Sequence, residues 1–222
     1  MDFDTPIEMP RATHYGNNYY VTYSSKLKRN VHLFSNLEYY NFLDLECDPN
    51  VIKFCEQPLK INFILENKVK HAIFDVWVRH KDGSEEMQEV KYDSELNGTD
   101  DVSIRSQEQI RREKHWCKEN NIAFAVRTDK ALKKGRYYLQ NLNVMSARLR
   151  RYNPFEEAYY TPIIIKMLEK SKTASIETLK THGMLPIGNE MPHLFYLYCK
   201  GIISLNIEDK PLDYGTEVTL CR

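Results

Sequence analysis

The sequence has no net charge, because 31 lysines and arginines balance 31 aspartates and glutamates over 222 residues. Proteins that bind nucleic acid through a general basic surface carry an excess of positive charge. That class is excluded, so any contact with a polyanion has to depend on local basic clusters. Charged residues make up 28% and apolar residues 42% of the chain, which is typical of a globular protein with its own core.

Cysteines are few and lack the spacing of a disulfide framework or a zinc site. There are five, an odd number, and none forms a CxxC pair, which is typical of a reducing compartment. No apolar run approaches the roughly 18 residues that a membrane helix needs. The first residues are polar and acidic, and we expect a loose arm up to about Gly16. We therefore expect neither a signal peptide nor a membrane span, and predict a cytoplasmic protein.

Hydrophobic patterns predict two domains. Up to residue 150, helical runs alternate with strand-like runs, and Asp82-Gly83 between two of these strands is a hairpin signal. A boundary is expected at Asn153-Pro154. Three helical segments and a β-hairpin follow, which is the outline of a winged-helix module over residues 151–222. Its third helix is apolar and aromatic, so we favour protein contact or nonspecific support over base reading for this domain.

The stretch QEVKY, Gln88–Tyr92, places Glu89 and Lys91 on one face of a strand. Alone, such a pair is most simply a solvated salt bridge. Its context changes the interpretation, because Asp75 precedes it on the neighbouring strand of the predicted hairpin. Glu38 belongs to a helix that we expect to pack on the same sheet. Three carboxylates and a lysine are therefore predicted to converge at one end of the sheet.

This set has the chemistry of a metal-dependent hydrolase. Carboxylate oxygens suit Mg²⁺, and we expect Glu38, Asp75 and Glu89 to hold the ion, with the backbone carbonyl of Val90 as a further ligand. Lys91 is expected to orient or deprotonate the attacking water and to offset charge at the phosphate in the transition state.

An acid followed by E-x-K is the general signature of PD-(D/E)xK nucleases, and the flanking residues are more specific. The segment SNLEYYNFLDLECDPNVIKFCEQP, residues 35–58, resembles the amino-terminal segment of the TnsA family. That family comprises the endonuclease subunits of Tn-seven-type heteromeric transposases. The matching residues are Ser35, Glu38, Leu45, Glu46, Asp48, Pro49, Val51, Gln57, Pro58, His71, Asp75, Val90 and Lys91.

The resemblance covers nearly the whole chain and implies both a fold and a function. The fold is a restriction-endonuclease-like PD-(D/E)xK core over residues 1–150, with a mixed central sheet flanked by helices, and a winged-helix-like domain over 151–222. The function is Mg²⁺-dependent cutting of double-stranded DNA near the 5′ ends of a transposon, with Mn²⁺ as a substitute ion. A TnsB-type DDE transposase and a TnsC-type AAA+ ATPase are the implied partners. Glu89 is an acid where some relatives have glutamine, which leaves the ligand set open.

Several residues keep more than one interpretation. The run RTDKALKKGR supplies the preferred DNA-binding candidates, although a charge run is often only a solvated face. These candidates are Arg127, Lys130, Lys133, Lys134 and Arg136. A second basic cluster, with Arg111 and Arg112, is diluted by Glu113. Gln57-Pro58 lies near the site or simply ends a strand, and Glu46 is expected to be a surface charge at a helix end.

Two other functions remain open from the sequence. One is a stand-alone restriction or repair nuclease of the same PD-(D/E)xK fold. The other is a non-catalytic subunit that only bridges DNA and protein partners. The intact set of Glu38, Asp75, Glu89 and Lys91 favours an enzyme over the bridging subunit.

Overall fold

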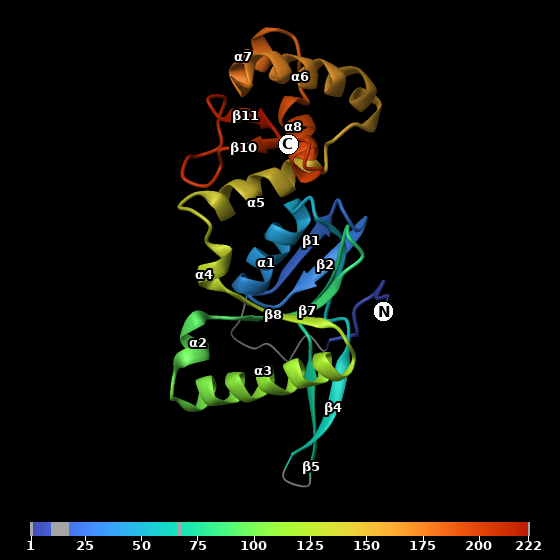
Figure 1. Ribbon diagram of the computed structural model, residues 1–222, viewed down its shortest axis with the longest axis vertical. Helices are drawn as coiled ribbons and strands as arrows, with labels where there is room; N and C mark the ends of the chain where they lie inside the picture. Colours follow the sequence, from blue (N-terminus) through green and yellow to red (C-terminus); the bar gives the residue numbers. More distant parts are fainter. Residues whose placement is uncertain (1, 10–17, 66–67, 222) are drawn as a thin grey trace. The chain divides into compact units, whose positions relative to one another are not determined.

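The computed structural model describes residues 2–9, 18–65 and 68–221 (Figure 1). The chain forms two compact units, called here the first and the second unit. The first comprises Met1–Phe42 and Val51–Leu132, and the second comprises Leu43–Asn50 and Lys133–Arg222. Residues 133–150 thus pack in the second unit, and the domain boundary predicted at residue 150 stays a prediction.

A mixed four-stranded sheet forms the centre of the first unit (Figure 1). Its order is β3-β6-β7-β8, with antiparallel pairing from β3 to β7 and parallel pairing between β7 and β8. The strands are β3 (Val51–Glu56), β6 (Val76–His80), β7 (Glu85–Lys91) and β8 (Ala123–Thr128). This confirms the predicted α/β class with a mixed sheet.

The connections follow from the chain between the strands. Gly83 has a φ of +84° in the tight turn between β6 and β7, a conformation that glycine adopts without steric cost. Parallel pairing of β7 with β8 needs a crossover. The helices α2 (Asp93–Asn97) and α3 (Asp101–Glu119) form it, and Asp100 caps α3 by accepting from the N–H groups of Val102 and Ser103.

The run KHAIFDVWVRH, residues 70–80, has the pattern of one continuous strand, but it contributes to two strands that belong to different sheets. It divides into β5 (Lys68–Ile73) and β6, and Asp75 lies at the bend between them. The Asp75 carbonyl accepts from the Gln57 N–H at 2.9 Å, and its Oδ2 accepts from the Val90 N–H at 2.7 Å. These two bonds hold the bend, so the tertiary pairing overrides the continuous strand pattern.

Helices cover both faces of the sheet. On one face, the fully buried Trp77 and Met87 pack with Cys117 of α3. On the other face, Val90 packs with Leu37 of α1 (Asn36–Cys47). Because side chains alternate along a strand, residues 87, 89 and 91 face α3 whereas Val90 faces α1.

Two hairpins and an amino-terminal arm complete the first unit. The hairpins are β1 (Tyr20–Ser24) with β2 (Arg29–Leu33) and β4 (Lys60–Leu65) with β5; the short helix α4 (Asp129–Leu132) follows β8. The expected loose arm is packed over residues 2–9, where the Ile7 N–H donates to the Gln57 carbonyl at 3.0 Å and the Phe3 ring meets Trp77 edge-on at 5.4 Å. The rest of that predicted arm lies outside the described residues.

The second unit contains helices and a three-stranded antiparallel sheet of order β10-β11-β9. The three helices and the hairpin expected beyond residue 153 are present. The strand β9 lies within a run expected to be helical, and with only three residues it carries little sequence signal. The elements are α5 (Tyr138–Leu149), η2 (Pro154–Glu156), α6 (Glu157–Ser171), β9 (Thr173–Ser175), α7 (Ile176–Thr181), α8 (Glu190–Cys199), β10 (Ile203–Leu205) and β11 (Glu217–Leu220).

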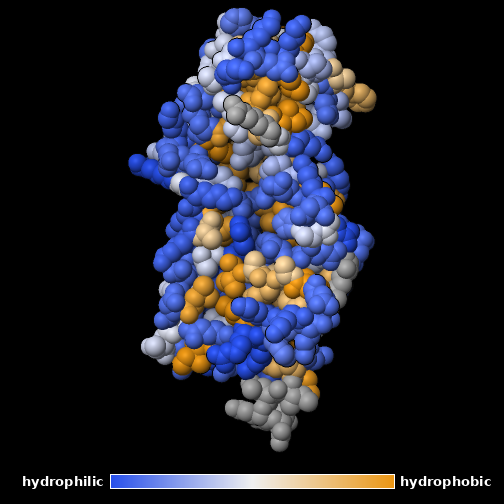
Figure 2. All heavy atoms as spheres, in the orientation of Figure 1, coloured by the Kyte–Doolittle hydropathy of each residue, from blue (hydrophilic) through white to orange (hydrophobic). Residues whose placement is uncertain are grey.

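Hydrophilic side chains cover most of the face shown in Figure 2, and apolar side chains appear between them in smaller groups. Among the helices of the described part of the chain, none is both long and apolar enough to cross a bilayer.

Candidate active site

The four predicted catalytic residues line one pocket of about 360 Å³ in the first unit. They come from three separated segments: Glu38 from α1, Asp75 from the bend before β6, and Glu89 and Lys91 from β7. Further polar lining residues are Gln57, His71, Gln109 and Arg112. The fold therefore brings together carboxylates that lie up to 51 positions apart in the sequence (89 − 38 = 51).

Glu89 and Lys91 form a buried pair on the α3 face of β7. The Lys91 Nζ lies 2.8 Å from Glu89 Oε1, and the two side chains are 19% and 1% exposed. The other carboxylate oxygen, Oε2, is buried and has no hydrogen-bond partner among the described residues. A solvated surface pair on an edge strand is thereby excluded, since β7 is an interior strand and Glu89 is removed from water.

Burial and neighbouring charges shift the pKa values of this pair. Burial, and then repulsion by Asp75 and Glu113, raises the pKa of Glu89 well above its usual value. Burial lowers the pKa of Lys91, but attraction to Glu89 and Asp75 outweighs it, so its pKa is raised. Lys91 thus stays a cation at neutral pH, beside carboxyl groups that tend to keep protons.

Glu38 combines a structural role with its place in the pocket. Its backbone N–H donates to Ser35 Oγ at 3.1 Å, and its Oε2 accepts from the Phe34 N–H at 3.1 Å. This reciprocal arrangement resembles a capping box, which explains the S-x-x-E spacing at the start of α1. Burial, and then the charge of Asp75, raises the pKa of Glu38 to about 7. The same bonds that begin the helix therefore hold this carboxyl in the pocket.

Gln57 directly follows β3 and bonds both Glu38 and Asp75, so it belongs to the pocket as well as to the point where the strand ends. Its Nε2 donates to Glu38 Oε2 at 3.3 Å, while its backbone N–H donates to the Asp75 carbonyl. Gln57 is buried and its backbone has a φ of +39°, which is an unfavourable conformation for any residue other than glycine. Strain of this kind is found where surrounding contacts fix a residue, often at functional sites.

Glu113 is the main residue whose place the sequence interpretation missed. The sequence pattern predicts an acid that dilutes a solvated basic cluster, yet Glu113 is fully buried and its Oε1 accepts from Gln109 Nε2 at 2.9 Å. The same Gln109 nitrogen donates to Glu89 Oε1 at 2.8 Å. The helical spacing of Ser106, Glu113 and Cys117 was the available signal, because all three lie on the buried face of α3. Glu46 was likewise expected at the surface and is buried.

The shifted carboxyls predict how the stability of the metal-free protein depends on pH. The pKa of Glu38 and that of Glu113 are both raised from 4.5 to about 7, and burial is the largest cause in each case. Between these values the folded state keeps protons that the unfolded chain releases, so the unfolding free energy falls as pH rises from about 5 to 8. A single carboxyl shifted this far contributes roughly 3 kcal/mol. Denaturant unfolding in EDTA at several pH values measures the effect.

The matched variants for this prediction lie on the same helix. Glu113→Gln keeps an oxygen for Gln109 but cannot ionise, so the loss of stability toward pH 8 should become smaller. Glu119→Gln changes an exposed acid of α3 and should leave the pH dependence as it is. Equal slopes in all three proteins would contradict the burial of a protonated carboxyl.

The preferred DNA-binding residues are divided between the two units. Arg127 and Lys130 belong to the first, while Lys133, Lys134 and Arg136 belong to the second. Lys130 forms an ion pair with Asp93, and Lys134 contacts the buried Asp44 at 2.7 Å. Two members thus have acidic partners within their own units, and DNA contact by this set stays a prediction.

Arg112 belongs to the second basic cluster, on α3, and its guanidinium lines the pocket. Its guanidinium lies 4.6 Å from the centre of the Phe63 ring and 2.9 Å from Glu108 Oε2. The neighbouring Arg111 is exposed and does not line the pocket. Together with Lys91, Arg112 gives the acidic pocket two cationic side chains.

The donor chemistry of the pocket suits a hard divalent cation, although no ligand cluster is preformed. Within residues 2–9, 18–65 and 68–221, no three His, Cys, Asp or Glu side chains are arranged as a metal site. Glu89 Oε1 lies 2.8 Å from Lys91 Nζ and accepts from Gln109 Nε2 at 2.8 Å. The unpartnered, buried Oε2 of Glu89 is an oxygen of the kind that Mg²⁺ binds.

Comparison with known proteins supports a nuclease assignment for this region. Residues 48–129 match the family described as TnsA-like endonuclease N terminal. The match runs from the end of α1 through β8 and includes Asp75, Glu89 and Lys91, whereas Glu38 precedes it. No curated protein matches the chain. Over residues 48–129, the chain is therefore similar to the TnsA-like endonuclease family.

Proposed function

We propose that this chain hydrolyses DNA phosphodiesters with Mg²⁺, or with Mn²⁺ in its place, as the nuclease subunit of a cut-and-paste transposase. The observation that carries the proposal is the single pocket formed by Glu38, Asp75, Glu89 and Lys91 within a chain that has a TnsA-like endonuclease domain. A chain that only bridges DNA and protein has no use for a buried lysine among carboxylates, which is costly to maintain.

Each pocket residue has a distinct part in the proposed reaction. Glu38, Asp75, Glu89 and the Val90 carbonyl are the proposed metal ligands, and the ion supplies an activated water and neutralises phosphate charge. Lys91, held as a cation against Glu89, orients the attacking water or offsets the charge that grows on the phosphate. Asp75 ties the bend to β7 through the Val90 N–H, so the acid and the lysine keep a fixed separation.

The similarity to the TnsA-like family also supports a proposal about the protein partners and about which DNA strand is cut. We infer cutting at the 5′ ends of the element, on the strand that is not transferred. A TnsB-type transposase cuts and joins the 3′ ends, and a TnsC-type AAA+ ATPase regulates both. Because the chain has no net charge, we expect its hold on DNA to come largely from these partners.

The second unit supports a winged-helix-like assignment with a role in protein contact. Its elements follow in the order α6, β9, α7, α8 and the β10/β11 hairpin, with β9 on the other side of β11. This order is similar to that of a winged helix. However, α8 is mostly buried and packs against α5, so it is not free to enter a groove of DNA.

The test is a cleavage assay on end-labelled transposon-end DNA with Mg²⁺, with and without the transposase and the ATPase. Cuts at fixed positions on the 5′ strand that require the partners would establish the proposal. Cutting of unrelated DNA by the chain alone would favour a stand-alone nuclease. Stable complexes that never cut would favour the bridging subunit.

Arg112 should contribute to binding rather than to chemistry. Arg112→Ala removes a cation from the pocket and should raise KM about ten-fold, with a smaller change in kcat. The slope of the logarithm of the DNA-binding constant against the logarithm of the salt concentration should also become smaller by about one, as expected for the loss of one phosphate contact. Cleavage and binding measured at several salt concentrations check this.

Arg111→Ala is the matched control, since it removes the adjacent, exposed arginine outside the pocket. If both variants behave alike, the effect comes from general charge on α3 and the assignment of Arg112 is wrong.

A further inference from the structure

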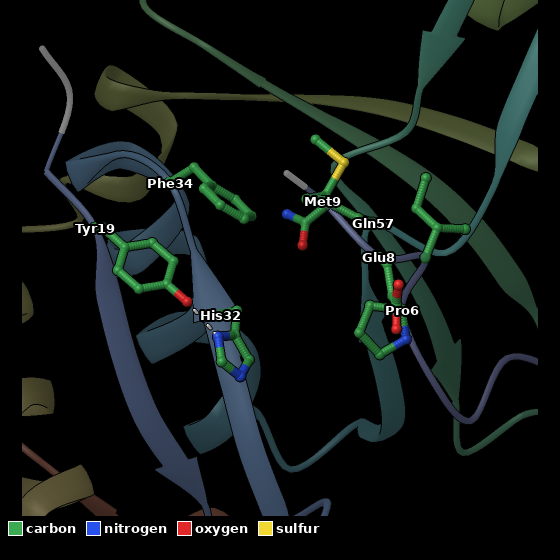
Figure 3. Close-up of a pocket in the computed structure, with 8 residues that line it drawn as sticks. Pro6, Glu8, Met9, Tyr19, His32, Phe34 and Gln57 are labelled. Carbon is green, nitrogen blue, oxygen red and sulfur yellow. Dashed lines mark hydrogen bonds between the residues drawn. The ribbon is translucent and has the colours of Figure 1, made fainter. Parts of the chain in front are cut away.

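A second pocket adjoins the proposed active site and has a different chemical character (Figure 3). Its volume is about 380 Å³, which is within the usual range for small-ligand sites of about 300–1,000 Å³. The two pockets share three lining residues, Met9, Phe34 and Gln57. Any ligand in the second pocket is therefore close to one held between Glu38 and Asp75.

Aromatic rings form one wall of this pocket. Tyr19 precedes β1, His32 lies on β2 and Phe34 follows it, and the three side chains stand together in Figure 3. The Tyr19 ring centre lies 5.3 Å from that of Phe34 and 6.0 Å from that of His32. Tyr19 lines the pocket and is 40% exposed, so a flat ligand can reach part of its surface.

The amino-terminal arm forms the opposite wall. Pro6, Glu8 and Met9 face the rings across the pocket in Figure 3, and the Gln57 amide lies between the two walls. Among the described lining residues there is no lysine or arginine, and Glu8 is an acid. This chemistry disfavours a phosphate group and favours a neutral, flat group that also accepts polar contacts.

We propose that this pocket holds one unpaired DNA base next to the phosphate that is cut. The inference rests on the proposed nuclease function and adds a substrate feature to it. Aromatic side chains bind unpaired bases by stacking, and every base has a face to offer. Gln57 connects the two sites, because its Nε2 donates to Glu38 while its side chain also lines the base pocket.

The proposal predicts that the DNA is locally opened in the complex, since a base inside a duplex cannot reach a pocket of this kind. A mismatch at the position of the extruded nucleotide lowers the energy needed to open it. It should therefore raise kcat/KM several-fold for the natural chain. Tyr19→Ala should lose this advantage and bind the mismatched DNA about ten-fold more weakly.

The experiment uses the full chain and duplex DNA of a transposon end that carries 2-aminopurine at one position at a time. Fluorescence is read in Ca²⁺, so the scan reports on base extrusion whether or not cleavage occurs. We expect a change at one position beside the cut, retained in Tyr19→Phe and lost in Tyr19→Ala. Tyr214→Ala removes an exposed tyrosine of the second unit and should change nothing.

Photo-crosslinking of 5-iodouracil at the same position provides a second readout that needs no variant, and Tyr19 is the expected attachment site. If no position responds, or if Tyr19→Ala behaves as the natural chain does, the base pocket is wrong even when cleavage is normal. Crosslinking of the pocket to a partner protein instead of DNA would overturn it as well. Absence of cleavage with an intact fluorescence change would count against the nuclease proposal alone.

Discussion

Asp75→Asn should reduce kcat/KM for DNA cleavage about 1,000-fold or more while the protein stays folded. The carboxylate lies in one pocket with Glu38 and Glu89, and its charge contributes to the raised pKa of both. Asparagine keeps an oxygen that can accept from the Val90 N–H, so the bend before β6 should survive. What disappears is the negative charge that a divalent cation needs. Single-turnover cleavage with thermal unfolding as a fold check measures this.

Asp82→Asn is the matched control, because it is the same change in the same hairpin, outside the pocket. Its side-chain oxygen bonds the Ser84 N–H in the turn, and asparagine can retain that bond. Normal cleavage in this variant with loss in Asp75→Asn ties the effect to the site. Full activity of Asp75→Asn would remove Asp75 from the mechanism.

Lys91→Met should lower kcat/KM by about 100- to 10,000-fold, which is the range for loss of a group that acts on a proton or a developing charge. Methionine keeps the length of the aliphatic part but removes the cation 2.8 Å from Glu89. Because the pKa of Glu89 is already raised, this carboxyl can take up a proton and limit the loss of stability. Activity should therefore fall much more than the free energy of unfolding.

The variant Lys91→Arg tests whether the position of the cation matters in addition to its charge. The guanidinium is planar and larger than an ammonium, and at this largely buried position it cannot place its charge where the Lys91 Nζ lies. We expect a loss of at least about 100-fold here too. Lys81→Met, in the exposed turn of the same hairpin, is the control and should cut normally. Near-normal cleavage by Lys91→Arg would show that only net charge matters.

Much of the first unit follows from local sequence patterns. The Asp82-Gly83 turn fixes the β6/β7 hairpin because glycine adopts the positive φ there without cost. Ser35 and Glu38 begin α1 through side-chain bonds to the backbone, which act over a few residues and so leave a readable spacing. The alternation of side chains along β7 places Glu89 and Lys91 on one face without the help of any tertiary contact.

Other features of the site depend on long-range contacts that no short pattern encodes. The bend at Asp75 interrupts a continuous strand pattern, and bonds from Gln57 and Val90, which lie 18 and 15 positions away, hold it there (75 − 57 = 18; 90 − 75 = 15). Glu113 looked like one more charge on a solvated helix, yet packing removes it from water.

The sequence alone therefore determined the chemical types of the proposed catalytic residues and the local elements that carry them. Only the tertiary structure decided that Gln57 joins the acidic pocket to an aromatic one and that Glu113 stands behind Glu89. The physical reason is the distance along the chain over which each kind of interaction acts. Turn geometry, capping and strand alternation act between near neighbours, whereas burial and shared hydrogen bonds arise when distant segments pack together.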